Sequence, residues 1–193
     1  DQPERGFSFM RNGPLDMRMD TSQEVTAATL LETLSDEELE SIIKNYGEER
    51  HYRRVVRAIR KAQAISPIVS TLQLSQILSG AIFSKRPTKI HPATRTFQAL
   101  RIAVNRELVH LKTALQDSLG ILNAGARLVT IAFHSLEDRI VKNFFQDEEK
   151  SCICPPRIPV CVCDKKPTLK VISRRVITAD ADEVVRNPRS SSA

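Results

Sequence analysis

The sequence predicts an α/β fold, namely the C-terminal part of a larger α/β domain with an all-helical domain inserted into it. Apolar residues recur at helical spacing from about residue 24 to residue 119, which predicts a largely helical first half. Residues 127–133 form a short apolar run, partly β-branched, which is typical of a buried strand. A buried strand needs neighbours, and few other segments here read as strands. We therefore expect the missing neighbours upstream of Asp1.

The composition excludes a disordered chain and a membrane-spanning one. Of the 193 residues, 41% are hydrophobic and 27% are charged, and no apolar run approaches the roughly 20 residues of a membrane helix. The net charge of +6 favours an anionic partner only where the charge is clustered. The polar start contains no signal peptide, and we expect processing or truncation to have shaped both ends of the chain.

Periodicity predicts four helices in the first half, at about residues 24–34, 35–46, 48–65 and 71–81. Ser35 followed by Glu38 indicates a capping box at the start of the second helix, and Gly47 is expected to end that helix. A polar connector with two prolines follows at residues 84–92.

The second half predicts a mixture of helices and strands. Pro92 suits the start of the longest helix, which is expected to run to Leu119. The strand at 127–133 precedes a helix at 136–145, which Ser135 and Asp138 are placed to cap. One strand or a bent pair is expected at 168–177 and a short helix at 178–186.

Two polar segments are candidates for a site. Asp16 and Arg18 lie in a charged loop, DMRMD, and loops often carry function; alternatively, the two side chains pair with each other. His134 and Ser135 follow the predicted strand, at the edge where open α/β sheets bind ligands and where a helix N-terminus attracts anions. A Ser–His catalytic pair is not expected, because adjacent residues on an extended chain point apart. The alternative is that Ser135 only caps the helix and that His134 is a hydrogen-bonded polar residue at the end of the strand.

Positive charge is concentrated in residues 50–61, which hold six Lys and Arg side chains. Helical spacing places Arg50, Arg53, Arg57, Arg60 and Lys61 on one face. Such a face can bind RNA phosphates in a salt-dependent manner, although a solvated surface is the alternative.

All four cysteines lie in one short stretch, at Cys152, Cys154, Cys161 and Cys163. Four thiolates can hold one structural zinc ion; disulfide pairs or four free thiols are the alternatives. The confinement of the cysteines to one stretch suits a reducing compartment. The six glycines form no Gly-x-Gly phosphate loop, so the chain itself contains no nucleotide cradle.

Several long segments resemble one family. These are ERGFSFMRNGPLDMRMD at residues 4–20, Tyr46 to Arg50, HPATRTFQALRIAVNREL at 91–108, LVTIAFHSLEDRIVKNFF at 128–145 and NPRSSSA at 187–193. They are similar to the bacterial MraW/RsmH family, essentially from end to end. The resemblance implies S-adenosylmethionine-dependent methylation of the N4 amine of one cytidine in small-subunit ribosomal RNA.

The resemblance also implies an architecture, a Rossmann-like class I methyltransferase domain interrupted by a helical insert. Residues 1–22 would be a loop segment of the methyltransferase domain, 23–92 the insert that recognises RNA, and 93–193 the C-terminal part of the methyltransferase domain. The main residues that bind S-adenosylmethionine would lie upstream of Asp1, and a final strand would follow Ala193.

The candidates for positioning the substrate are polar residues from three segments. They are Asp16, Arg18, His134, Ser135, Glu137, Asp138, Arg139, Asn187 and Arg189. No general base is assigned, because the amine loses its proton easily once it carries the methyl group. The small ribosomal subunit is the expected partner, in the cytoplasm of a bacterium or in an organelle of a eukaryote. The alternatives are a truncated fragment that acts only as an RNA-binding or assembly module, and a methyltransferase with another acceptor.

Overall fold

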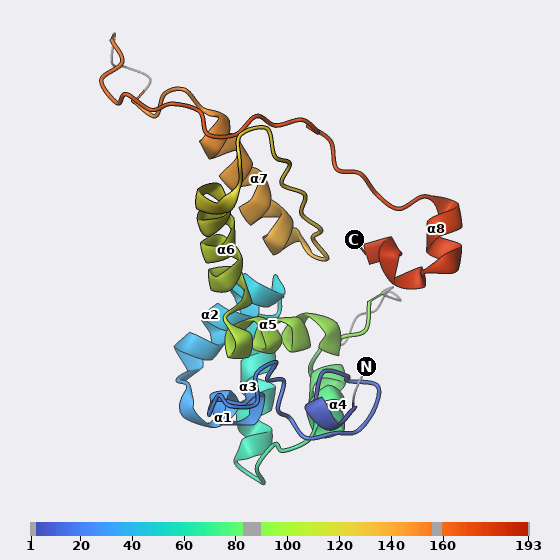
Figure 1. The fold of residues 1–193 in the computed structure, drawn as a ribbon. Coiled ribbons are helices and arrows are strands. Elements are labelled where there is room, and N and C mark those ends of the chain that lie inside the picture. The colour runs from blue at the N-terminus through green and yellow to red at the C-terminus, as the bar shows by residue number, and fades with distance from the viewer. Residues whose placement is uncertain (1–2, 83–89, 156–159, 193) are drawn as a thin grey trace. The chain divides into compact units, whose positions relative to one another are not determined.

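The computed structural model describes residues 3–82, 90–155 and 160–192, and these residues are mostly helical (Figure 1). The chain divides into two compact units, Asp1–Glu107 and Leu108–Ala193, which we call unit 1 and unit 2. The domain boundaries expected after residues 22 and 92 stay a prediction, because the units reflect only contacts within this chain.

Among the described residues of unit 1 there are a short 3-10 helix and five α-helices. They are η1 (Pro3–Arg5), α1 (Ala27–Thr33), α2 (Asp36–Gly47), α3 (Tyr52–Gln63), α4 (Thr71–Ala81) and α5 (Ala93–Asn105). The four predicted helices of the first half are confirmed within a few residues. The capping box is confirmed too, because Ser35 Oγ accepts the Glu38 N–H at 3.3 Å and Glu38 Oε2 accepts the Ser35 N–H at 2.8 Å.

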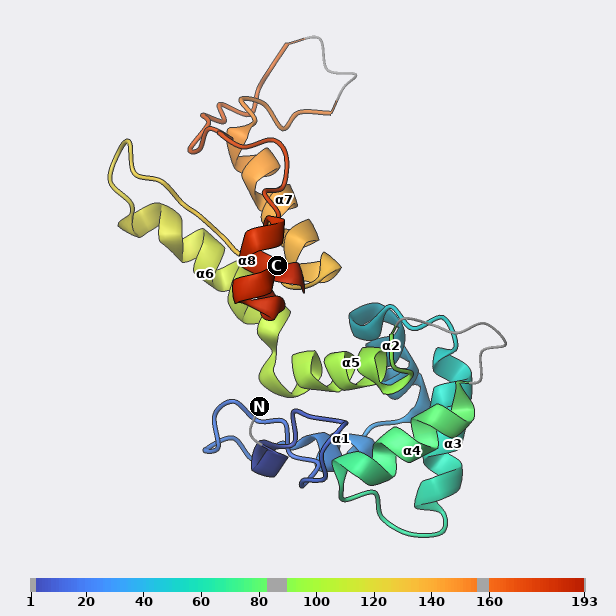
Figure 2. The same ribbon diagram turned by 90° about the vertical axis from the view of Figure 1, so that its right-hand side faces the viewer.

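Gly47 has a different role from the one predicted. It is the last residue of α2, and the left-handed turn that ends the helix falls on Glu48, at φ 48°. Gly47 instead lets α5 pack closely on α2, which lies beside it in Figures 1 and 2. A Cβ atom at Gly47 would lie only 2.5 Å from the carbonyl oxygen of Arg95. Because glycine has no Cβ atom, α5 can pack closely against α2 at this point.

The core of unit 1 brings residues of all five α-helices together. Its buried side chains include Leu31, Leu39, Ile43, Val55, Ile59, Leu74, Leu78, Phe97 and Leu100. Leu15 and Met17 from the N-terminal loop join this core. The loop is also attached to α4, because the Thr71 hydroxyl donates to the carbonyl of Arg11 at 2.9 Å and accepts the Gly13 N–H at 3.1 Å. Loop and helices therefore form one packed body.

Three α-helices and a 3-10 helix follow in the second half. They are α6 (Glu107–Ile121), α7 (Ser135–Glu149), α8 (Ala181–Arg186) and η2 (Pro188–Ser192). The predicted single helix from Pro92 to Leu119 is wrong, because Arg106 adopts a left-handed conformation, φ 50°, and separates α5 from α6. Apolar spacing continues through such a one-residue break, so periodicity does not reveal it. Both short helices expected later in the chain are confirmed, with α7 longer and α8 shorter than predicted.

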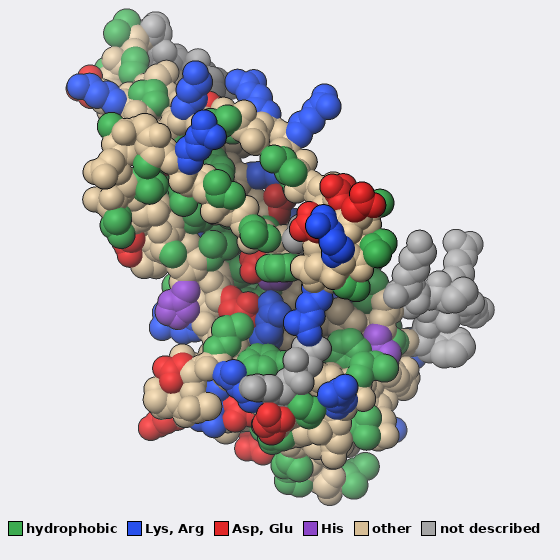
Figure 3. Space-filling view, turned by 45° about the vertical axis from the view of Figure 1, so that its right-hand side comes forward, with side chains coloured by type: hydrophobic (Ala, Val, Ile, Leu, Met, Phe, Trp, Pro, Cys, Tyr) green, Lys and Arg blue, Asp and Glu red, His purple; other side chains and the backbone are tan. Residues whose placement is uncertain are grey.

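The two segments predicted as strands, 127–133 and 168–177, are not strands in the described part of this chain. Within residues 3–82, 90–155 and 160–192 no strand forms, and 127–133 and 168–177 are irregular. Val129, Ile131 and Phe133 are 82%, 74% and 57% exposed. A strand satisfies its backbone hydrogen bonds only beside another strand, and the described residues supply no such partner. Hydrophobic side chains (green) are therefore visible at the surface of unit 2, in the upper part of Figure 3.

The predicted connector at 84–92 lies mostly outside the described residues, and its last residue, Pro92, immediately precedes α5. No helix in the described part of the chain is long and apolar enough to cross a membrane.

Candidate functional site

Asp16 and Arg18 form a bidentate ion pair within the N-terminal loop. Arg18 Nε donates to Asp16 Oδ1 at 2.7 Å, and Nη2 donates to Oδ2 at 2.9 Å. The hydrogen bond from the Arg18 guanidinium lowers the pKa of the Asp16 carboxyl below its ordinary value. Arg18 also donates to the carbonyls of Thr21 and Gln23. Of the two interpretations of these residues, mutual pairing is therefore observed; direct contact with a substrate stays a prediction.

The residue between them, Met17, holds the loop in one conformation. Its backbone is left-handed, φ 63°, and its side chain is buried. Asn105 of α5 fixes this turn, since its Nδ2 donates to the Met17 carbonyl and its Oδ1 accepts the Met19 N–H, both at 2.7 Å. A left-handed methionine costs roughly 1 kcal/mol or more and persists only where surrounding contacts impose it. The charged loop is thus a rigid feature attached to α5.

In unit 2, His134 is the residue that caps α7. Its Nδ1 accepts the Glu137 N–H at 3.4 Å, and Glu137 Oε2 accepts the Phe133 N–H at 2.9 Å. The prediction that Ser135 caps the helix is therefore wrong, because Ser135 is already the first helical residue. The cap occupies the Nδ1 lone pair, so a neutral ring carries its hydrogen on Nε2. His134 is not placed to act as a base for Ser135.

The second ring nitrogen of His134 is the unusual group here. Nε2 is buried and makes no hydrogen bond to any described residue, and the carboxylate oxygen Oε1 of Glu137 lies 3.5 Å away. Buried polar atoms in proteins are normally hydrogen-bonded, so an unpaired N–H donor is a candidate contact for a ligand.

The other predicted positioning residues have simpler surroundings. Asp138 accepts a hydrogen bond from Lys142 Nζ at 2.7 Å. Ser135 and Arg139 are exposed on α7. Asn187 ends α8 with a hydrogen bond to the Glu183 carbonyl at 2.7 Å, and Arg189 is exposed in η2. The structure brings His134 and Glu137 together, and it pairs Asp138 with a lysine of its own helix. The roles of all these residues stay predictions.

The exposed cations of α3 are not the same set of residues that the sequence indicates. Arg50, Arg53, Arg57 and Lys61 are exposed, as expected. Arg60 is not part of this face, because it donates to the carbonyls of Leu31 and Leu34 at 2.6 and 2.5 Å and to Asp36 Oδ1 at 2.6 Å. It thereby satisfies carbonyls at the end of α1.

Arg54 replaces Arg60 on the basic face. Arg54 is exposed and follows Arg53 directly, but it was not among the residues that helical spacing placed on the predicted face. Arg53 and Lys44 of α2 both lie over the ring of Tyr52, 5.5 Å from its centroid. The exposed cations of α3 therefore continue onto α2, and we call Lys44, Arg50, Arg53, Arg54, Arg57 and Lys61 the basic face.

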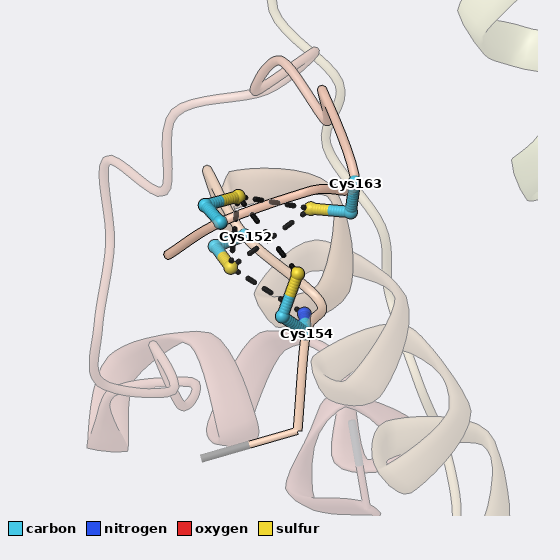
Figure 4. Close-up of side chains that lie close together, drawn as sticks. Cys152, Cys154 and Cys163 are labelled. Carbon is cyan, nitrogen blue, oxygen red and sulfur yellow. Dashed lines mark hydrogen bonds between the residues drawn. The ribbon is translucent and has the colours of Figure 1, made fainter. Parts of the chain in front are cut away.

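The four cysteines are brought together, and all four are free thiols. Figure 4 shows the sulfur atoms of Cys152, Cys154 and Cys163 turned toward one another. The N–H groups of Ile153 and Lys165 donate to Cys163 and lower the pKa of its thiol to about 6. At Cys152 the N–H of Cys154 favours the thiolate, but the neighbouring thiols outweigh it and raise the pKa of Cys152 to about 12. Four sulfur atoms within 4.8 Å of one another do not all ionise without a cation, because like charges this close repel.

The comparison with known families decides the relationship of the chain. The family model described as the MraW methylase family matches residues 1–193. The chain belongs to this family.

Curated relatives agree with the family match. The chain is 50% identical over 194 residues to Ribosomal RNA small subunit methyltransferase H of Syntrophotalea carbinolica, covering all of this chain and 62% of the relative. It is 52% identical over 193 residues to the protein of the same name from Dehalococcoides mccartyi strain BAV1, covering all of this chain and 54% of that relative. The chain thus spans somewhat more than half the length of the methylases it matches.

The described residues of this chain do not include a cradle for the S-adenosylmethionine that the family implies. Class I methyltransferases hold such a cofactor beside a glycine-rich turn at a strand end, a backbone arrangement like that of dinucleotide sites. Here Gly6 and Gly13 lie in the N-terminal loop, Gly47 and Gly80 lie in helices, and none of the glycines follows a strand. We therefore assign no residue of this chain to the cofactor.

Proposed function

We propose that the chain is part of an enzyme that methylates the N4 amine of one cytidine in small-subunit ribosomal RNA, with S-adenosylmethionine as the methyl donor. The proposal is carried by the end-to-end identity of about one half to enzymes named as ribosomal RNA small subunit methyltransferases. The same identity favours the enzyme over a separate RNA-binding module. The partner would be the small ribosomal subunit in the bacterial cytoplasm.

We further propose that residues 127–133 and 168–177 are strands of a Rossmann-like sheet whose other strands lie outside this chain. The support is chemical. Val129, Ile131 and Phe133 alternate along the chain and are exposed, as are Ile172 and Ile177. Burial of apolar surface contributes about 25 cal/mol per Å², so these side chains are stabilised when neighbouring strands and helices cover them. His134 would then stand at the carboxyl end of a strand, where ligands bind.

The chemistry places clear demands on the protein. The cytosine amine is a weak nucleophile, because its lone pair is delocalised into the ring. The cofactor supplies an electrophilic methyl group on a sulfonium. The residues must remove the base from any stack and hold its amine about 3–3.5 Å from that methyl group. In this assignment the Nε2–H of His134 donates to a cytosine acceptor, and the carboxylates of Glu137 and Asp138 accept hydrogen bonds from the amine N–H groups.

Substitutions at the start of α7 test this assignment in the complete encoded protein. We expect His134→Ala and Asp138→Ala each to slow methyl transfer to small ribosomal subunits by roughly 10- to 100-fold, because the base loses its alignment. Asp147→Ala is the matched control, since Asp147 of the same helix pairs at 2.6 Å with Lys150, the residue that follows the helix, much as Asp138 pairs with Lys142. The readout is N4-methylcytidine in digested ribosomal RNA.

The two parts of the proposal fail differently. Wild-type protein that transfers no methyl group to this amine would contradict the function. Wild-type activity together with unchanged turnover of His134→Ala and Asp138→Ala would contradict the role of the α7 site alone.

The basic face is proposed to hold RNA phosphates. Arg53→Ala/Arg57→Ala should weaken RNA binding and reduce the slope of log K against log salt concentration by about 0.7–0.9 for each lost phosphate contact. Lys112→Ala/Arg127→Ala removes the same charge from exposed positions of unit 2 and serves as control. Equal slopes for the two double variants would show that the effect is one of net charge and not of this face.

A further inference from the structure

The four cysteine sulfur atoms form a compact group at the surface of unit 2. All lie within 4.8 Å of one another. Cys161 Sγ is 3.4 Å from Cys152 Sγ, 3.4 Å from Cys163 Sγ and 3.9 Å from Cys154 Sγ, and Cys163 Sγ is 3.9 Å from Cys152 Sγ. The sulfur atoms come from two segments, 152–154 and 161–163, and each segment contributes two. Neither pair is a bonded disulfide, for which the sulfur atoms would be about 2.05 Å apart.

These distances match one tetrahedral ion. A zinc–thiolate bond is about 2.3 Å long, so the corners of a tetrahedral ZnS4 centre are about 3.8 Å apart. Four of the six sulfur–sulfur separations are 3.4–3.9 Å and bracket this value, and all six are within 4.8 Å. The sulfur atoms therefore already stand close to where a zinc ion would require them.

The backbone around the cysteines supports thiolate charge. The N–H groups of Ile153, Cys154 and Val162 point at the sulfur atoms of Cys163, Cys152 and Cys154, each at 3.4 Å. The left-handed turn at Asp164, φ 47°, precedes Lys165, whose N–H also donates to Cys163. Such second-shell hydrogen bonds orient metal ligands and disperse their negative charge. Four free thiols with no metal to bind would not need these donors.

The surroundings explain what an ion would contribute. Ile153, Val160 and Val162 are exposed, so apolar contacts do not hold the two cysteine segments together. A structural metal commonly replaces a hydrophobic core where a segment is too small to build one. We propose that Cys152, Cys154, Cys161 and Cys163 bind one Zn²⁺ ion as four thiolates and that this ion joins segments 152–154 and 161–163. Four protein ligands leave no open coordination position, so the site is structural and takes no part in methyl transfer.

Metal content and spectroscopy of the complete encoded protein, purified with reductant and without chelator, test the proposal. We expect one tightly bound zinc per chain by elemental analysis. After removal of the zinc, Zn²⁺ alone should rebind stoichiometrically, and Co²⁺ alone should produce the visible d–d and sulfur-to-metal charge-transfer bands of a tetrahedral four-thiolate site. The cobalt spectrum needs no variant, so it remains decisive if substitutions at the cysteines prevent folding.

Variants add a matched comparison. Cys154→Ser should lower zinc affinity by more than the roughly 10- to 100-fold typical of losing an outer-shell partner, while Ser151→Ala beside the cluster should leave it unchanged. Three outcomes overturn the proposal: no stoichiometric binding of Zn²⁺ by the reduced protein, iron in place of zinc, or two disulfides in protein kept under reductant. Methyltransferase activity is a separate readout, so failure here leaves the proposed function standing.

Discussion

Arg53 and Arg60 show how residues of one type on one helix acquire different tasks. Both lie on α3 at helical spacing, and the sequence offers no reason to separate them. Arg60 reaches the carbonyls that end α1 and the carboxylate of Asp36, whereas Arg53 stays 72% exposed. The distinction depends on where α1 lies, which is a contact between segments about 30 residues apart. The cysteines behave differently, because four ligands within twelve residues can meet without help from distant segments.

The ion pair of Asp16 predicts a pH-dependent contribution to stability. The folded pKa of Asp16 lies below its unfolded value of about 3.9, so the pair stabilises the fold above about pH 4, and this contribution is lost as the pH falls through the folded pKa. Asp16→Asn should therefore lower the urea midpoint at pH 7, and the deficit relative to wild type should shrink at pH 3. Glu24→Gln, at an exposed position of the same unit, controls for the lost charge. A deficit that stays constant between the two pH values would contradict the prediction.

Whole elements were predicted well where their signals are local. Helices α1 to α4 were found from apolar spacing, and the start of α2 from Ser35 and Glu38, because capping and i to i+4 hydrogen bonds involve near neighbours. The break at Arg106 and the absence of the strands were missed. A strand is defined by a partner elsewhere in the chain, so the apolar run at 127–133 predicts a strand only on the assumption that the partner is present.

The close contact between α2 and α5 predicts that alanine at Gly47 destabilises the protein, whereas alanine at the control position Gly80 stabilises it. Gly47→Ala should lower the free energy of unfolding by about 1–3 kcal/mol, because the new Cβ would overlap the Arg95 carbonyl and force the helices apart. Gly80→Ala places a Cβ in open space within α4 and should raise stability by about 0.5–1 kcal/mol through helix propensity. Urea unfolding followed by circular dichroism measures both. An equal effect of the two substitutions would refute the close-packing role of Gly47.

At the scale of the whole molecule, the two units differ in how they are stabilised. Unit 1 has a continuous core to which helices and loop contribute. In unit 2 the buried hydrophobic side chains among the described residues are Leu115, Leu136 and Val141, while many apolar side chains are exposed. Regions with few buried contacts open with little free-energy cost.

Hydrogen exchange should display this difference in the 193-residue chain. Amides in α2, α3 and α5 should be the slowest, with opening free energies that approach global unfolding, whereas amides at 127–133 should exchange nearly unprotected. Deuterium uptake of peptides, followed by mass spectrometry, provides the measurement. Protection of 127–133 equal to that of α5 would mean that a paired strand has formed there. Addition of Zn²⁺ should slow exchange only near the cysteine segments if the proposed site exists.

The sequence by itself determined helices α1 to α4, the capping box of α2, the family and the chemical character of the cysteine cluster. Each of these rests on residue identities and on interactions within a few residues along the chain. Only the tertiary structure decided that Arg60 supports α1, that Gly47 admits α5, that His134 and not Ser135 caps α7, and that 127–133 stands unpaired. The first two depend on contacts between segments distant in sequence. The His134 cap depends on a local competition between neighbouring polar side chains, and a strand forms only when a partner meets its hydrogen bonds.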